Sequence, residues 1–248
     1  MTQVEQGSRS TVAILGIPVD KLTMGDAIER IDGFIRSGEP HWIATADASM
    51  LVDAGDDSTF RERLLTADMI TPDSSGVLWA GGKVGVKLEE RVSGVDLVDR
   101  LCALSADRGY RVFLLGAAPG VAEMAAERLR LKHPGCNIVG TRHGFFPASD
   151  DELVAHEVAE FDPDILFVAM GIPRQETFIV TTQQIIKARV AIGVGGSLDV
   201  HSGQAKRAPA LFQRMKVEWF WRLLQNPKKW RKTMKLPVFM LRVLRSKP

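Results

Sequence analysis

The chain has 248 residues, of which 45% are apolar and 25% are charged, and its formal net charge is +2. These values allow a substantial buried core and exclude global disorder. No apolar run approaches the ~18 residues needed to cross a bilayer, and the N-terminus lacks the basic start and apolar stretch of a secretory signal, so we expect a cytoplasmic protein.

Apolar runs of strand length alternate with segments of helical spacing along most of the chain. We predict strands at residues 11–15, 41–45, 69–71, 111–115, 137–140, 165–170 and 190–194, and helices at 24–36, 92–108, about 120–132, 150–160 and 175–187. Strands separated by helices predict βαβ units and a parallel sheet. Their continuous apolar runs indicate that both sheet faces are covered. The predicted fold class is therefore α/β, with a parallel sheet flanked by helices.

A basic segment follows the last predicted strand. Residues 214–248 contain eleven Lys or Arg and one acid, Glu218, for a net charge of +10, so the preceding 213 residues carry −8. Three of the five tryptophans also lie there: Trp219, Trp221 and Trp230. We therefore divide the chain into a body, residues 1–210, and a basic, amphipathic, helical C-terminal appendage, residues 211–248.

The appendage predicts a negatively charged partner. Tryptophan interleaved with Lys and Arg on an amphipathic helix is typical of an element at a membrane interface, and an anionic membrane surface is the partner we expect. A solvated basic face is the alternative. Nucleic acid is disfavoured because no recognition motif is present. A homo-oligomer would be another way to cover the apolar face of this segment.

Ligands of open parallel sheets bind beyond the carboxyl ends of the strands. Gly116 and Gly120 follow the predicted strand 111–115. They either let a phosphate approach the backbone and the next helix N-terminus, or form a tight strand–helix turn. Gly195, Gly196 and Asp199 follow the last strand. They form either a loop pressed against a ligand or a flexible connector.

Polar residues follow two further predicted strands. Gly171 precedes Gln175 and Glu176, which either bind a sugar or uracil or cap the next helix. Asp73 follows the strand at 69–71 and is either a helix cap or a general base. Asp162 and Asp164 form a DxD pattern, but they precede their strand and indicate a turn. The histidines lack ligand spacing, and two cysteines, Cys102 and Cys136, predict neither a disulfide framework nor a zinc site.

Seven segments together carry a resemblance to a known family. In chain order they are PDSSGV, RVSGVDL, FLLGAAPGVAEMAAERL, GTRHGFF, DPDILFVAMGIPRQE, IGVGGSLDVHSGQAKRAP and VEWFWRLLQNP. They resemble the WecG/TagA/CpsF glycosyltransferases (glycosyltransferase family 26), and the resemblance runs from about residue 11 to residue 232.

The resemblance implies a Rossmann-like body and an inverting hexosyltransferase in bacterial cell-surface polysaccharide synthesis. The donor is expected to be a UDP-sugar carrying N-acetylmannosamine, its uronic acid or glucose. The acceptor is expected to be a polyprenyl-diphosphate-linked sugar at the cytoplasmic face of the plasma membrane, which the enzyme reaches as a peripheral protein. No cofactor is implied, and we expect a metal-independent reaction.

The resemblance also implies roles for individual residues. Asp73 corresponds to the general base, and Thr45, Asp47 and Arg91 to the acceptor pocket. The residues expected to bind the donor are Gly116, Gly120, Gly171, Gln175, Glu176, Gly195, Gly196 and Asp199. The cations expected near the diphosphates are Arg207, Arg222, Lys229 and Lys232.

Two residues depart from the pattern of the family. The family usually has Asn where this chain has Asp47, and Gly where it has Ser74. Both lie near the expected base, so a second hypothesis stays open: a nucleotide-sugar-binding module without catalytic activity. An NAD(P) oxidoreductase is disfavoured because the chain lacks GxGxxG and the ribose-binding acid that follows it.

Overall fold

The structure, a computed structural model, describes residues 9–205 and 234–246. A six-stranded sheet forms its centre, in the order β4-β3-β8-β7-β5-β6. The strands are β3 (His41–Ala46), β4 (Met69–Pro72), β5 (Val112–Gly116), β6 (Ile138–Arg142), β7 (Ile165–Ala169) and β8 (Val190–Gly193). Every neighbouring pair is parallel. The predicted α/β fold with a parallel sheet is confirmed.

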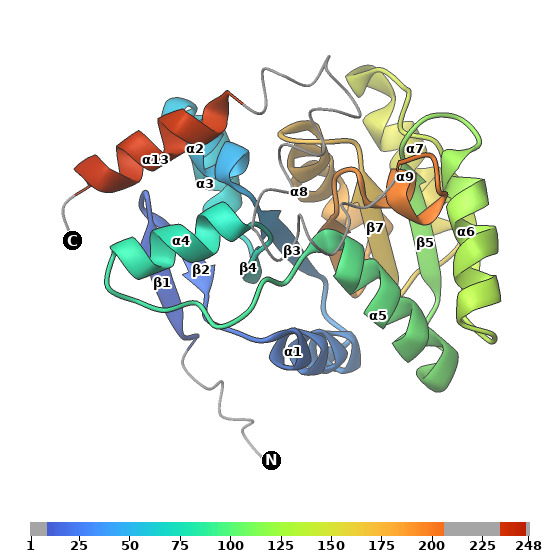
Figure 1. The fold of residues 1–248 in the computed structure, drawn as a ribbon. Coiled ribbons are helices and arrows are strands. Elements are labelled where there is room, and N and C mark those ends of the chain that lie inside the picture. The colour runs from blue at the N-terminus through green and yellow to red at the C-terminus, as the bar shows by residue number, and fades with distance from the viewer. Residues whose placement is uncertain (1–8, 206–233, 247–248) are drawn as a thin grey trace, which may run out of the picture.

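Helices cover both faces of this sheet (Figure 1). One face packs against α1 (Met24–Ser37), α5 (Gly94–Arg108), α6 (Val121–Lys132) and α9 (Ser197–His201). The other packs against α2 (Ala48–Asp56), α3 (Ser58–Leu65), α7 (Asp151–Ala159), which follows a 3-10 turn at Ala148–Asp150, and α8 (Arg174–Ile186). In addition, α4 (Ser75–Lys83) and α13 (Lys235–Arg245) join this second layer at the β4 end.

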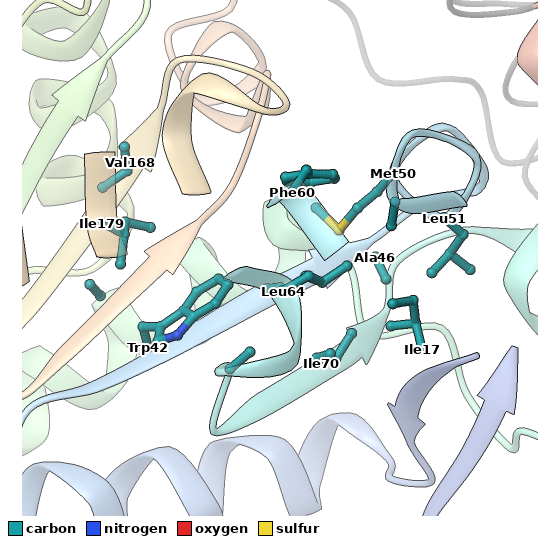
Figure 2. Close-up of a cluster of buried hydrophobic side chains, with 14 of the residues drawn as sticks. Ile17, Trp42, Ala46, Met50, Leu51, Phe60, Leu64, Ile70, Val168 and Ile179 are labelled. Carbon is teal, nitrogen blue, oxygen red and sulfur yellow. The ribbon is translucent and has the colours of Figure 1, made fainter. Parts of the chain in front are cut away.

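Alternation along the strands explains the two cores. In β5, Val112 and Leu114 face the first helical layer, whereas Phe113 and Leu115 face the second. All four are buried, which is why the strand reads as a continuous apolar run. Figure 2 shows part of the second core, where side chains of α2 and α3 lie over β3 and β4. The residues labelled there include Trp42, Ala46, Met50, Leu51, Phe60, Leu64 and Ile70.

A short hairpin precedes the sheet. Strands β1 (Thr11–Ile14) and β2 (Ile17–Asp20) pair antiparallel. Leu15 and Gly16 form the turn with φ of 49° and 78°, the positive values that a two-residue hairpin turn requires. Asp20 links the hairpin to β4, because its carboxylate accepts a hydrogen bond from the amide of Ile70 at 2.7 Å. The sequence predicted a strand at residues 11–15 but not its partner β2.

The five predicted helices are present, with small shifts at their ends. Four short helices were not predicted. Three of them, α2, α3 and α4, begin after the N-caps Asp47, Asp57 and Ser74 and have eight or nine residues, and the fourth, α9, has five. The helical period in the sequence is therefore brief. No helix within residues 9–205 and 234–246 is both long and apolar enough to span a membrane.

Candidate active site

Thr45 lies where the centre of the sheet ends. Its hydroxyl donates a hydrogen bond to the carbonyl oxygen of Gly193 at 2.7 Å, and the side chain is buried. This bond joins the carboxyl ends of β3 and β8. Thr45 is thus at the edge where ligands of open α/β sheets bind, and its role in the acceptor pocket stays a prediction.

Gln175 joins the loops that follow β7 and β8. Its Oε1 accepts from the amide of Gly171 at 3.2 Å and from that of Gly195 at 3.0 Å. Its Nε2 donates to Oε1 of Glu176 at 2.7 Å, and both side chains are buried. Pro173 occupies the N-cap position of α8, and no side chain caps this helix end. Glu176 lies in the first turn of this helix, as the alternative role at the helix start allows. The bonds of Gln175 instead set the spacing of the two loops, and sugar or uracil binding by the pair stays a prediction.

Gly193 provides the room for this pair. A methyl group on its Cα would lie 2.7 Å from Nε2 of Gln175 and 3.3 Å from Oε1 of Glu176. A larger residue at this position would displace the buried amide and carboxylate. The glycine at the end of β8 therefore packs a polar pair beneath the loop at Gly195 and Gly196.

Asp73 follows β4 at the same edge. Its backbone amide donates to the carbonyl oxygen of Ala46 at 2.9 Å, so the end of β3 fixes its backbone. Ser74 is the N-cap of α4 and accepts from the amide of Val77. The N-cap of this helix is thus Ser74, the residue after Asp73, and not Asp73 itself.

Asp47 occupies the equivalent position after β3. Ala46 pairs with Pro72 in the parallel register, so Asp47 and Asp73 each follow a paired strand end. Oδ1 of Asp47 accepts from the amide of Met50 at 2.9 Å, and this bond caps α2. The same oxygen also accepts from the hydroxyl of Ser49 at 2.6 Å. Asp47, which stands where the family usually has Asn, therefore serves as the N-cap of α2.

Arg91 is brought to this edge by the segment before α5. The amide of Val92 donates to the carbonyl oxygen of Pro72 at 3.0 Å, and Thr71 donates back to the carbonyl oxygen of Val92 at 3.0 Å. Nη2 of Arg91 lies 3.8 Å from the carboxylate of Asp96. The backbone next to Arg91 thus lies alongside the strand end that precedes Asp73, and the role of Arg91 in the acceptor pocket stays a prediction.

The loop after β8 closes against the start of α5. A methyl group on Gly94 would lie 3.1 Å from Oγ of Ser197 and 3.2 Å from Val194, so these two segments are in close contact. Asp199 lies two residues further along, in the first turn of α9, with its carboxylate 3.5 Å from the Cβ position of Gly196. This loop is packed on its inner side, so the flexible-connector alternative is wrong.

Gly116 and Gly120 differ in their surroundings. Gly116 has a φ of 133°, and a methyl group there would lie 2.4 Å from the carbonyl oxygen of Ala169. The missing side chain lets β5 pack tightly against β7, a role that neither the phosphate-binding nor the turn alternative included. Gly120 precedes α6 with a φ of 82°, and no described atom lies within 4 Å of its Cβ position. Phosphate binding at this helix start stays a prediction.

The sequence did not single out an open hollow at the ends of β6 and β7. Its lining residues are Gly144, Phe145, Phe146, Pro147, Met170 and Arg174. The ring of Phe145 is 70% exposed, whereas Phe146 packs between the guanidinium groups of Arg142 and Arg174, at 5.0 and 5.3 Å from its ring centre. The signal in the sequence was the pair of aromatic residues directly after a strand.

The remaining predicted site residues are the four cations expected near the diphosphates. Arg207, Arg222, Lys229 and Lys232 lie outside the described residues. Among the residues that the structure does describe, no group of three or more His, Cys, Asp or Glu side chains could hold a metal ion.

Comparison with known proteins gives one family. The glycosyl transferase WecG/TagA/CpsF family matches residues 12–248. The chain is 32% identical over 249 residues to N-acetylglucosaminyldiphosphoundecaprenol N-acetyl-beta-D-mannosaminyltransferase of Staphylococcus aureus (strain MRSA252), which covers 100% of this chain and 97% of the relative. It is 37% identical over 204 residues to the protein of the same name from Bacillus spizizenii (strain ATCC 23059 / NRRL B-14472 / W23), covering 82% and 79%.

Proposed function

The chain belongs to the WecG/TagA/CpsF family of glycosyltransferases, and we propose that it transfers N-acetylmannosamine from a UDP-sugar to N-acetylglucosamine linked to polyprenyl diphosphate. The observation that carries this proposal is the 32% identity over the whole chain to a transferase named for these two sugars. The uronic acid of N-acetylmannosamine and glucose are the other donor sugars to be compared.

Asp73 is proposed as the general base. Its carboxylate takes the proton from the acceptor hydroxyl, whose oxygen then attacks the anomeric carbon of the donor. The bond from this carbon to the diphosphate oxygen breaks, and UDP leaves from the opposite side with inversion. The support for this role is positional: Asp73 follows β4 at the edge where ligands bind, and its backbone is fixed to Ala46.

The donor is proposed to lie across the loops after β5, β6, β7 and β8. The exposed ring of Phe145 offers a face on which uracil would stack, an interaction worth ~1–3 kcal/mol per base. The open start of α6 at Gly120 offers backbone amides to the diphosphate. Gln175 supports this arrangement because it fixes the spacing of the loops at Gly171 and Gly195. No bound metal is part of the proposal.

The acceptor is proposed to enter at the β3–β4 side. Asp47 and Arg91 lie there beside Asp73, and the oxygen of Thr45 has acceptor capacity beyond the bond that it donates to Gly193. Arg207, Arg222, Lys229 and Lys232 are proposed to meet the diphosphates. This division of the site leaves the donor on one side of Asp73 and the lipid-linked sugar on the other.

Peripheral docking on an anionic membrane is proposed for the appendage. Its described helix, α13, exposes Met234, just before it, together with Val238, Met240, Leu241 and Leu244. Basic residues on the same helix include Arg245. An apolar face with basic flanks is typical of helices that lie in a membrane interface. The catalytic edge would then face a lipid-linked acceptor.

The experiment is an assay of UDP release and sugar transfer. UDP-N-acetylmannosamine, its uronate and UDP-glucose are each offered with a short-chain prenyl-diphosphate-N-acetylglucosamine. We expect UDP-N-acetylmannosamine to give UDP and a lipid-linked disaccharide in equal amounts. Binding of UDP without product from any donor would contradict the proposal and favour the non-catalytic nucleotide-sugar-binding module.

A further inference from the structure

The last described helix, α13, packs across two helices that begin at the site (Figure 1). Phe239 is fully buried and Val243 nearly so, and both belong to the core that α2 and α4 share. Leu236 reaches the first turn of α4, where its Cδ1 is 3.4 Å from the Cβ position of Gly76. A C-terminal segment thus forms part of the wall behind the catalytic edge.

Two basic residues of α13 tie it to α2. Lys235 forms an ion pair with Asp53. Arg242 forms one with Asp56 at 2.6 Å and also donates to the carbonyl oxygen of Val52 at 3.2 Å. These cations lie at the C-terminal half of α2, where a positive charge is favourable to the helix dipole. These bonds are therefore confined to one part of α2: α13 holds its C-terminal half, at the end opposite to the site.

Both clamped helices carry a site residue at their start. Asp47 is the N-cap of α2, and Asp73 is separated from the first residue of α4 only by its N-cap, Ser74. A small shift of either helix along its axis moves the adjacent carboxylate. Misplacement of a catalytic group by about 1 Å can cost ~10²-fold in rate.

The helix α4 needs such support. It has nine residues, whereas isolated helices shorter than ~12–15 residues are marginal in water. Three of the nine are glycines, Gly76, Gly81 and Gly82, each of which costs ~1 kcal/mol relative to alanine. Among the described elements, α4 packs chiefly against β1 and α13. The anchoring by α13 is thus a large part of what fixes this helix.

We propose that α13 is a positioning element of the reaction, which holds α2 and α4 so that Asp47 and Asp73 keep their places at the sheet edge. Phe239 and Arg242 are its positioning residues. The expected effect on kcat rests on the proposed function. The structural effect does not: α4 should become less stable when its contacts with α13 are weakened, with or without substrate.

The test compares Phe239→Ala with Leu131→Ala in the full chain. Leu131 lies on α6, away from α13, and is 80% exposed, so it is the control. The assay uses a short-chain prenyl-diphosphate-N-acetylglucosamine without membranes. We expect Phe239→Ala to lower kcat by about tenfold or more with the donor KM within about twofold, Phe239→Leu to recover most of the loss, and Leu131→Ala to leave kcat unchanged.

Hydrogen exchange supplies the readout that needs no substrate. The backbone amides of residues 74–83 should exchange at least about tenfold faster in Phe239→Ala than in Leu131→Ala, while those of β5 and β7 stay protected. Unchanged exchange in α4, or an unchanged kcat, would overturn the inference. Faster exchange in a protein whose parent transfers no sugar would instead contradict only the proposed function.

Arg242→Gln covers the case in which Phe239→Ala does not fold. Arg242 is partly exposed, so its loss leaves the core intact, yet it removes the bonds to Asp56 and Val52. We expect kcat to fall about two- to fivefold at unchanged donor KM, with Arg242→Lys in between. Equal kcat values for Arg242→Gln and the parent protein would overturn the inference in this case.

Discussion

Gln175 is the residue on which the geometry of the site depends most visibly. Its carbonyl oxygen binds amides from two loops, at Gly171 and Gly195, and its amide group binds Glu176. Replacement by alanine would leave two partly buried backbone N–H groups without this partner, and each such group costs up to ~1–3 kcal/mol. The residue therefore connects the stability of the fold to the spacing of the donor loops.

We predict that Gln175→Ala lowers the free energy of unfolding by ~2 kcal/mol or more and weakens donor binding. Gln184→Ala, an exposed glutamine on the same helix, is the control, and it should change the free energy of unfolding by less than ~0.5 kcal/mol. Urea denaturation and calorimetry with UDP measure the two effects. Equal stabilities of the two variants would contradict the bridging role.

The sequence located these site residues but not their partners. It placed Asp73, Thr45, Gln175 and Gly195 after strands, and a parallel sheet brings strand ends to one edge. It left open whether Gln175 capped a helix. The amide that Gln175 binds belongs to Gly195, which is 20 residues away in the chain and comes close only in the folded protein. Asp47 shows the same limit, since its capping of α2 depends on a helix that was not predicted.

At the scale of elements, α9 is a short helix held by a partly buried histidine. His201 contacts the carbonyl oxygen of Val95 in α5 through Nε2 at 3.0 Å. Burial lowers the pKa of His201 below its usual 6.5, although the bond to Val95 works in the opposite direction. The folded chain therefore favours neutral His201. The stability of α9, the helix that carries Asp199, is expected to depend on pH for this reason.

The sign of this linkage gives a prediction. Because the folded pKa of His201 lies below the unfolded value of 6.5, its contribution is complete above about pH 6.5 and is lost as the pH falls through the folded pKa. His201→Gln should therefore reduce the fall in the free energy of unfolding between about pH 7 and 5, measured with urea. His156→Gln, an exposed histidine on α7, is the control. A pH profile unchanged by His201→Gln would contradict this account.

Elements with a clear apolar pattern were predictable, and those without one were not. The strands β5, β7 and β8 are continuous apolar runs, and the helices α1, α5 and α8 have enough residues for their period to show in the sequence. The hairpin strand β2 has four residues and contains Pro18, and α4 contains three glycines, so local propensity opposes both. Packing against Ile70 and α13 decides these elements, and a single sequence does not display that packing.

At the scale of the whole molecule, charge divides the chain. The first 213 residues carry −8 and residues 214–248 carry +10. The structure adds that part of the basic segment is not separate from the body, because α13 buries Phe239 and Val243 against it. The proposed appendage thus has an inner face that belongs to the body and an outer face available for a partner.

The outer face of α13 gives the membrane prediction. Vesicles containing anionic lipid should carry the full chain upward in flotation, and neutral vesicles or high salt should weaken this binding. Leu241→Asp combined with Leu244→Asp should reduce flotation by about tenfold or more. Leu131→Asp, at a leucine on α6 that is 80% exposed, is the control. Equal flotation of both proteins would contradict α13 as the docking surface.

The most direct test of the account is the rate of sugar transfer by Asp73→Asn in a single turnover. Asp162→Asn is the matched control, because Asp162 precedes β7 and lies at the opposite edge of the sheet. The account predicts that Asp73→Asn lowers the transfer rate by ~10²–10⁴-fold while the affinity for UDP stays within about twofold, and that Asp162→Asn transfers at the parental rate. Transfer by Asp73→Asn at the parental rate would contradict the role of Asp73 as the base.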